Sequence, residues 1–447
     1  MADLKKVLMI SYVFPPMAAV GGYRTIKFCK YLPSFGWQPS VLTVTKGFNF
    51  AYDYSLLDRL DPALNIYRSA NLEPHLWYDR RTGGFPARSG TSTPPSPSGG
   101  GPDKRPSLPA RWKRGLRQLV SIPDTNNFWI PFGILTGLRA ARREKVDIVY
   151  STSPPASAHV VGWAVSRLMS IPLVTDFRDL WTLNENYTAR NLIPAAGRFD
   201  RLLERRVLSR AHQVITTTDT FTAMMKSRYP DKRADRFHTI TNGLDADDFK
   251  DIAFPQKKND YFTILHLGSL YGNRNPEFFF EAMAAWKKMR PGAESETRVC
   301  LIGNTPGCET LAERYGLSDM VTFAGHIPHR DVLARLWEAD LLLLILGFEK
   351  AGTGVIPAKL FEYVATGRPI LAFVPDGEAR RIIDRYRRGT AVTSPDIETT
   401  VEFIDRGYLA WKEAERAPES TFDLPPEFDR KAQAGQLADI LNTIVEE

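Results

Sequence analysis

A strand, a loop and a helix follow one another between residues 341 and 377, and this stretch constrains the fold more than any other. Residues 341–346 (LLLLIL) are apolar and uncharged, which is typical of a strand buried on both faces of a parallel sheet. The loop after it contains Gly352 and Gly354, and a helix pattern begins near Ala358. The stretch therefore predicts part of an α/β domain.

The start of this helix has the chemistry to bind an anion. Glycines let backbone amides approach a ligand closely, and a helix N-terminus offers unpaired N–H groups and about half a positive charge. Lys359 lies in the first turn, where the helix dipole disfavours a cation, so a negatively charged ligand would explain it. Glu362, three residues on, shares its face. These groups can hold a diphosphate and the hydroxyls of a sugar or ribose. The alternative is an ordinary turn with a surface lysine and glutamate.

The stretch resembles the donor-binding segment of retaining nucleotide-sugar glycosyltransferases of the family 4-like kind. In one branch of that family the segment ends K-L-x-E-Y-x-A-x-G-x-P-I, and the matching residues here are Lys359, Leu360, Glu362, Tyr363, Ala365, Gly367, Pro369 and Ile370. The resemblance implies the GT-B fold, with two Rossmann-like α/β domains facing across a cleft. It also implies donor contacts from Lys359, Leu360 and Gly354, and ribose binding by Glu362. The family more often has two glutamates, and Gly354 stands where the first would be.

Two further segments of the C-terminal half carry the same resemblance. Residues 269–276 (SLYGNRNP) follow a predicted strand, and many family members place an arginine and a lysine in this loop to neutralise the leaving diphosphate. Here Ser269 stands in place of the arginine and Arg274 in place of the lysine, so Arg274 and Lys359 are the predicted pair. The segment G-H-I ends at Ile327, which the resemblance places near the nucleobase.

The N-terminal half begins with a β-α-β unit. A strand over residues 6–12 leads into a loop that ends in Gly21 and Gly22, and a helix is predicted from about residue 23 to 35. The glycine pair does not form the G-x-G-x-x-G pattern, which argues against a dehydrogenase. The resemblance implies that Gly21 and Gly22 come near the donor phosphates. A tight turn that packs helix on strand is the alternative.

A cluster of charges follows the strand predicted over residues 172–177. Asp176, Arg178 and Asp179 stand at its end, and such charges are poorly explained by folding alone because buried charges need partners. The run D-F-R-D-L-W resembles the acceptor side of the same family. One carboxylate would orient or deprotonate an acceptor hydroxyl, and Arg178 would hold a phosphate or carboxylate of the acceptor. These three residues are the predicted catalytic group. The alternative is an internal salt bridge between Arg178 and either aspartate.

The basic character of the chain is local. The net charge is +7, yet residues 80–117 alone hold nine Lys or Arg and one Asp. Residues 83–109 are mostly Gly, Pro and Ser and are predicted to be mobile. Residues 110–122 form a basic amphipathic segment, and the stretch 108–122 is predicted to contact an anionic membrane surface. A solvated helix is the alternative, and no recognition motif points to nucleic acid.

The length leaves room for two or three domains, and the composition is that of a soluble globular protein. No run approaches the roughly 18 apolar residues of a membrane-spanning helix, and the N-terminus leads directly into a strand, so no secretory signal is visible. Cys29, Cys300 and Cys308 have no metal-binding spacing and are expected to be small hydrophobic residues in a reducing cytoplasm. We expect an acceptor-side domain over residues 1–250, a nucleotide-sugar-binding domain over 260–425, and a helix over 426–447 that returns to the first domain.

These features predict a retaining glycosyltransferase that moves a sugar from a nucleoside-diphosphate sugar to a glycan or lipid-linked acceptor in polysaccharide or glycoconjugate biosynthesis. We expect a cytoplasmic protein, peripheral on the inner face of the membrane. No cofactor is expected besides the nucleotide sugar, and no metal is expected. Two alternatives remain: a nucleotide-sugar epimerase on the same scaffold, and a catalytically impaired protein that binds glycan or nucleotide sugar.

Overall fold

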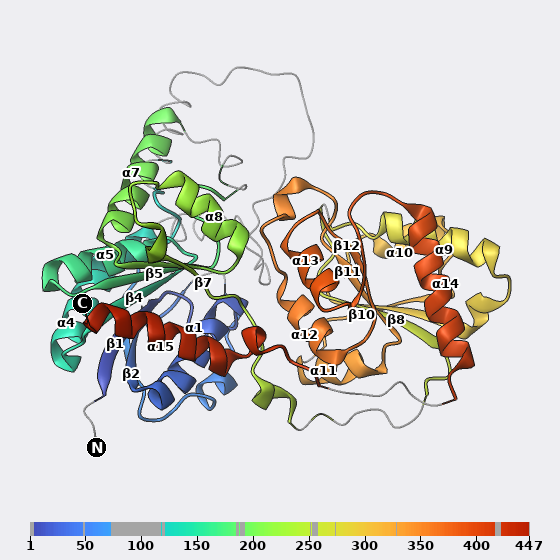
Figure 1. The fold of residues 1–447 in the computed structure, drawn as a ribbon, viewed down its shortest axis with the longest axis horizontal. Helices are drawn as coiled ribbons and strands as arrows, with labels where there is room; N and C mark the ends of the chain where they lie inside the picture. Colours follow the sequence, from blue (N-terminus) through green and yellow to red (C-terminus); the bar gives the residue numbers. More distant parts are fainter. Residues whose placement is uncertain are drawn as a thin grey trace, which may run out of the picture. The chain divides into compact units, whose positions relative to one another are not determined.

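The computed structural model describes residues 4–47, 50–72, 118, 121–184, 187, 193–250, 252, 258–272, 274–327, 329–415 and 422–446. They form two compact units (Figure 1), the first from Met1–Thr241 with Arg430–Glu447 and the second from Asn242–Asp429. The predicted insert of residues 83–109 and most of the basic segment 110–122 lie outside the described residues.

The first unit is built on a seven-stranded parallel sheet with the order β3-β2-β1-β4-β5-β6-β7. Its strands are β1 (Lys5–Ser11), β2 (Trp37–Val44), β3 (Asn65–Ser69), β4 (Ile148–Ser153), β5 (Leu173–Phe177), β6 (Gln213–Thr216) and β7 (Phe237–Thr239). Its helices are α1 (Val20–Tyr31), α4 (Ile130–Glu144), α5 (Ser157–Met169), α7 (Pro194–Arg210), α8 (Asp219–Arg228) and α15 (Arg430–Glu446).

The core of this unit has two layers, one on each face of the sheet, because side chains along a strand alternate between the two faces. Leu8 and Ile10 of β1 pack in the cluster that contains residues of α4, α5, α7 and α8, whereas Val7 and Met9 pack in the cluster with α1 and α15. Successive side chains of a strand point to opposite faces. Both faces of the sheet are therefore covered by helices, which is why β1 is apolar at consecutive positions.

The C-terminal helix α15 completes the first unit by packing against α1. Leu437 and Leu441 are fully buried in the cluster that α15 shares with α1 and β1. The Oδ1 atom of Asn442 accepts hydrogen bonds from Lys5 Nζ at 3.0 Å and from Trp37 Nε1 at 3.1 Å. The last helix of the chain thus covers one face of the N-terminal sheet (Figure 1).

The second unit is built on a six-stranded parallel sheet with the order β10-β9-β8-β11-β12-β13. Its strands are β8 (Phe262–Leu267), β9 (Thr297–Ile302), β10 (Val321–Gly325), β11 (Leu341–Ile345), β12 (Ile370–Phe373) and β13 (Gly389–Val392). Its helices are α9 (Glu277–Met289), α10 (Cys308–Arg314), α11 (His329–Glu338), α12 (Ala358–Thr366), α13 (Glu378–Arg385) and α14 (Ile397–Glu413). Helices α9, α10 and α14 share one core cluster, and α11, α12 and α13 share the other.

Short 3-10 helices connect these elements. They are η1 (Leu32–Phe35), η2 (Tyr54–Leu57), η3 (Asn127–Trp129), η4 (Ala234–Arg236), η5 (Ala246–Phe249), η6 (Ala293–Glu296), η7 (Lys350–Gly352) and η8 (Pro426–Phe428).

The boundary between the units lies at Thr241, earlier than the predicted residue 250. Residues 242–249 belong to the second unit because Phe249 packs there, with its ring centroid 4.7 Å from that of Phe422 and 5.9 Å from that of Trp337. Leu244 N also donates to Phe428 O at 2.8 Å.

Helix α1 begins at Val20, three residues before the predicted start, so Gly21 and Gly22 lie in its first turn and not in the loop. It ends at Tyr31, where η1 continues, and Gly36 closes η1 in the left-handed conformation with φ 84°. Neither Gly21 nor Gly22 has positive φ. Backbone conformation therefore does not require glycine at either position, and a Cβ atom would be too close to a neighbour only at Gly21.

The three cysteines are free, with Cys29 and Cys308 buried and Cys300 partly buried, as expected for small apolar side chains. Within the described part of the chain, no helix combines the length and the hydropathy needed to cross a bilayer.

The packing of α15 predicts a large difference between two substitutions on this one helix. Leu441→Ala empties a fully buried position and should lower the free energy of unfolding of the first unit by about 2–5 kcal/mol. Val445→Ala, at a position that is 42% exposed, should change it by less than about 0.5 kcal/mol. Urea denaturation followed by tryptophan fluorescence measures both. Equal, small effects would show that α15 does not stabilise the first unit.

Candidate functional site

The order of each sheet reverses next to its first strand, between β1 and β4 in the first unit and between β8 and β11 in the second. Open α/β sheets bind ligands outside the carboxyl ends of the strands at such a switch point. The predicted site residues fall into two groups, one in each unit, and each group is described within its own unit.

In the second unit, Lys359 lies in the first turn of α12 and reaches the carboxyl end of β8. Its Nζ atom donates to Leu267 O at 2.5 Å and lies 3.3 Å from His266 Nε2. Leu360 and Phe361 are fully buried beside it and fix the helix on the sheet. The ammonium therefore lies at the switch point of this sheet.

The electrostatics around Lys359 favour an anionic ligand. Burial and, after it, the positive charge of Arg274 lower the pKa of the Lys359 ammonium to about 7, against an opposing effect of Glu362. Arg274 and Lys359, the predicted cation pair, are thus close enough to repel each other. An anion bound between them would relieve that repulsion and raise the pKa of Lys359.

Two glycines that the sequence analysis did not single out line the same place. Gly268 has φ +106°, and a Cβ atom there would lie 3.3 Å from Lys359 Nζ. Gly303 has φ +131°, and its Cβ would lie 2.5 Å from Gly268 O. Any larger residue would be strained at either position. The sequence signal available for Gly268 was a glycine directly after the predicted strand.

The remaining predicted donor residues differ in their placement. The side chain of Leu360 faces the core and its N–H donates to Pro357 O at 2.9 Å, so the prediction that Leu360 contacts the donor has to be corrected to a packing role. Gly354 is buried in the turn after η7. Ile327 is partly buried against the same cluster as α12. Glu362 is partly buried and acts electrostatically on Lys359.

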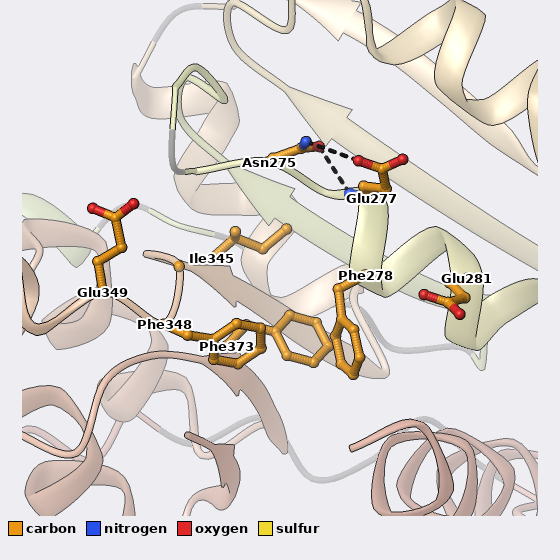
Figure 2. A pocket seen from close by; sticks show the side chains of 9 residues that line it. Asn275, Glu277, Phe278, Glu281, Ile345, Phe348, Glu349 and Phe373 are labelled. Carbon is orange, nitrogen blue, oxygen red and sulfur yellow. Dashed lines mark hydrogen bonds between the residues drawn. The ribbon is translucent and has the colours of Figure 1, made fainter. Parts of the chain in front are cut away.

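A shallow pocket of about 470 Å³ opens next to the first turns of α9 (Figure 2). Three phenylalanine rings pack against one another with centroids 5.2 to 6.1 Å apart. The residues that line the pocket include Phe278, Phe348, Phe373, Glu277, Glu281 and Glu349. The pocket belongs to the α9 face of the sheet, whereas α12 packs on the other face. Its three carboxylates also disfavour an anionic ligand, so it is distinct from the cation pair.

In the first unit, Asp176 is fully buried and pairs with Arg24 of α1. Arg24 Nε and Nη2 donate to its two oxygens at 2.9 and 3.0 Å, while Tyr150 and Thr152 hydroxyls donate at 2.5 and 3.0 Å. Burial raises the pKa of Asp176, but the charge of Arg24 and these hydrogen bonds outweigh it and hold the pKa below its usual range. The carboxylate is enclosed by its partners. The predicted catalytic role of Asp176 is therefore replaced by a structural one.

Arg178 lies at the surface end of β5 and contacts Gly21. Its Nε donates to Ser153 O at 2.9 Å and its Nη2 to Pro154 O at 2.6 Å. A Cβ atom on Gly21 would lie 2.2 Å from Arg178 Nη1. The structure thus brings together two predicted residues, and the absence of a side chain at Gly21 makes room for the guanidinium. Gly22 contacts the loop instead, with its Cβ position 3.4 Å from Val13 O.

Asp179 is exposed. Trp181 and Thr182, which follow it, form hydrogen bonds with buried acids of α7. Trp181 Nε1 donates to Asp200 at 3.0 Å, and Thr182 N donates to Glu204 at 3.2 Å. Asp200 and Glu204 are fully buried on α7. The sequence analysis did not find Asp200 and Glu204 as hydrogen-bond acceptors. Acids four residues apart on a charged helix usually indicate an exposed face and not a buried one.

Among the described residues, no group of three or more His, Cys, Asp or Glu is placed to hold a metal ion.

Comparison with known proteins identifies the family. A model of glycosyl transferase 4-like domains matches residues 23–243, and a model of group 1 glycosyl transferases matches residues 247–421. Together the two matches follow the two structural units. The chain belongs to the family 4-like glycosyltransferases of GT-B fold. The predicted family and fold class, with two parallel-sheet Rossmann-like domains, are thus confirmed.

Individual relatives of this glycosyltransferase family are distant. A D-inositol 3-phosphate glycosyltransferase of Acidothermus cellulolyticus is 24% identical over 249 residues, which are 51% of this chain and 54% of that protein. The chain thus spans about half the length of the curated relatives it matches. Sucrose-phosphate synthase from Thermosynechococcus elongatus has a TM-score of 0.54 at 16% identity, covering 99% of this chain and 98% of that one. A variant of S. aureus TarM, in complex with fondaparinux, alpha-GlcNAc-glycerol and UDP, has a TM-score of 0.52 at 10% identity, covering 99% of both chains. These structures share the fold.

The contrast between Asp176 and Asp179 predicts two different outcomes. Asp176→Asn leaves the Arg24 guanidinium buried without its carboxylate and should cost about 3–5 kcal/mol in the free energy of unfolding. Asp179→Asn, at an exposed position, should change it by less than about 0.5 kcal/mol. Chemical denaturation of both variants measures this difference. A stable but inactive Asp176→Asn protein would instead support the catalytic role that the sequence suggested.

Proposed function

We propose that this protein is a retaining glycosyltransferase that transfers a sugar from a nucleoside-diphosphate sugar to a glycan or lipid-linked acceptor. The observation that carries the proposal is the pair of cations, Lys359 and Arg274, at the switch point of a family 4-like fold. A diphosphate is the anion that this arrangement fits. The UDP bound in the TarM complex, which has the same fold, also supports a nucleotide donor.

In the proposed reaction, the bond between the sugar C1 and the diphosphate oxygen breaks while the acceptor hydroxyl oxygen bonds to C1, and the hydroxyl proton passes to the departing diphosphate. Lys359 and Arg274 stabilise the negative charge that builds up on the leaving diphosphate. The backbone N–H groups of Ala358 and Lys359 precede the first intrahelical bond of α12 and add to this stabilisation. Fixed charges and dipoles aimed at a developing charge are usually the largest single contribution to catalysis. Glu362, three residues along the same helix, would bind the ribose.

The acceptor half of the proposal rests on Arg178 and Asp179. The guanidinium of Arg178 is fixed by two carbonyl oxygens and packs on Gly21, so its orientation is set before an acceptor arrives. We propose that it binds a phosphate or carboxylate of the acceptor and that Asp179 orients the attacking hydroxyl. The D-inositol 3-phosphate named for the curated relative carries such a phosphate, which supports a phosphate-bearing acceptor here.

We further propose that the enzyme needs neither a metal nor a cofactor, since the cation pair supplies the charge that a metal would otherwise provide. A cytoplasmic protein, peripheral on the membrane through residues 108–122, fits a lipid-linked acceptor in glycoconjugate biosynthesis. Turnover that chelators abolish would contradict the metal-independent mechanism. Proton NMR of the product reports whether the anomeric configuration is retained.

Donor binding tests the central assignment. Lys359→Ala should weaken binding of the preferred nucleoside diphosphate about 10-fold to 100-fold, because a hydrogen bond to a charged group is lost. Isothermal titration with UDP-, GDP- and ADP-sugars and their free diphosphates measures this. The matched control is Lys412→Ala, on α14, whose ammonium pairs with Glu296 at 3.0 Å. A wild-type protein that binds no nucleotide sugar, or equal binding by both variants, would contradict the proposal. Isomerised sugar with donor alone would indicate an epimerase.

Acceptor kinetics test the second half. Arg178→Ala should raise the KM for a phosphate-bearing acceptor at least about 10-fold while donor affinity stays within about 3-fold. Gly21→Ala should have a similar effect, because its Cβ would displace the guanidinium. Gly197→Ala is the control, since its Cβ would meet only the flexible end of Arg201, at 3.3 Å. If Gly21→Ala weakens only donor binding, the glycine serves the donor phosphates, as the sequence alone suggested.

A further inference from the structure

His266 is a buried titratable residue that the proposed reaction does not yet use. It lies on β8, one residue before the strand ends, and its side chain is fully buried. The ring Nδ1 atom lies 2.9 Å from Leu343 O of the neighbouring strand β11, and Nε2 lies 3.3 Å from Lys359 Nζ. The ring thus spans the switch point, from the backbone of β11 to the cation on α12.

These two contacts define the tautomer of His266. A carbonyl oxygen only accepts hydrogen bonds, so Nδ1 must carry the proton that is donated to Leu343 O. A second proton, on Nε2, would put a buried imidazolium against the Lys359 ammonium. Burial, followed by the charge of Lys359, in fact holds the pKa of His266 well below its usual range. Nε2 is therefore unprotonated and presents its lone pair to Lys359.

We propose that His266 is a positioning residue for the donor diphosphate: its Nε2 accepts a hydrogen bond from the Lys359 ammonium and, with Leu267 O, fixes where that ammonium points. The inference rests on the proposed function, because it assumes that Lys359 binds the diphosphate. Two acceptors on β8 then hold two of the three ammonium protons. Gly268, whose Cβ position lies 3.3 Å from Nζ, keeps side-chain atoms away from the ammonium.

The same geometry links donor binding to protonation of Lys359. The groups that act on it are His266 on β8, Arg274 in the loop after β8 and Glu362 on α12 itself. The pKa of the free ammonium is about 7, lowered first by burial, so it is increasingly neutral above that pH. Only the protonated form attracts a diphosphate. Donor affinity should therefore be highest below pH 7 and fall as the pH rises through 7 and above.

The experiment compares two substitutions of His266 across pH 6 to 9. His266→Phe keeps a ring but removes the acceptor, so the dissociation constant of the preferred nucleoside diphosphate at pH 7.5 should rise about 10-fold. The midpoint of the affinity loss should also move to lower pH, because the ammonium loses a group that stabilises its charged form. His266→Gln can place its Oε1 near the position of Nε2 and should restore both the affinity and the midpoint. Titrations use UDP, GDP, ADP and inorganic pyrophosphate.

The matched control is His159→Phe, which removes a fully buried histidine of the first unit and should leave the affinity and its pH profile unchanged. Thermal melting of every variant checks folding. If His266→Phe binds as tightly as wild type while Lys359→Ala does not, the inference is overturned and the proposed function stands. If affinity falls but the midpoint is unmoved and Gln does not rescue it, His266 serves packing only, which also overturns the inference. If the wild type binds none of the four probes, the proposed function itself fails.

Discussion

The backbone N–H and carbonyl of Leu267, at the carboxyl end of β8, have no partner on β11. They determine where Lys359 lies. The ladder between β8 and β11 pairs residues up to His266 and Leu343, and beyond them the two strands separate. The N–H of Leu267 then donates to the hydroxyl of Tyr363 at 2.9 Å, and its carbonyl accepts from Lys359 at 2.5 Å. Because a buried backbone group without a partner costs about 1–3 kcal/mol, α12 is held in place by the groups that the sheet leaves open. The position of the cation therefore follows from the splitting of the sheet.

The first unit uses a different interaction for a structural purpose. Arg24 of α1 donates to both oxygens of Asp176 and to the carbonyl oxygens of Thr241, at 2.7 Å, and Ile240, at 2.9 Å. It thereby ties a helix at the start of the chain to β5 and to the residues where the chain leaves the unit. A buried ion pair repays its desolvation cost only when its geometry is good and its remaining hydrogen bonds are made, as they are here. The Arg24–Asp176 ion pair holds together three segments that lie far apart in the sequence.

Local pattern was enough to predict those features that depend on near neighbours in the sequence. The apolar run before Gly347 predicted β11, and the residues after it predicted a helix start that places Lys359 in the first turn of α12. The role of Lys359 in donor binding stays a prediction. Asp176 was misassigned because its partner, Arg24, lies 152 residues away, and no spacing rule connects them. The start of α1 was placed too late because glycine at a helix start was interpreted as loop, whereas Gly21 is required by contact with Arg178. His266 could not have been found from the sequence, since its role arises from strand order, which brings β8 beside β11 and α12.

The two units fix in the same way the cations that we propose to bind ligands. Arg178 is fixed by the carbonyl oxygens of Ser153 and Pro154, and Lys359 by that of Leu267, and each cation lies against a glycine. Carbonyl oxygens at strand ends orient a cation without carrying a net charge of their own, so the field of the cation remains available to an anionic ligand. A carboxylate partner orients a cation equally well but cancels its charge, as Asp176 does for Arg24. In this chain the cation that a carboxylate fixes, Arg24, holds the fold together, whereas the two that carbonyl oxygens fix are those proposed to bind ligands.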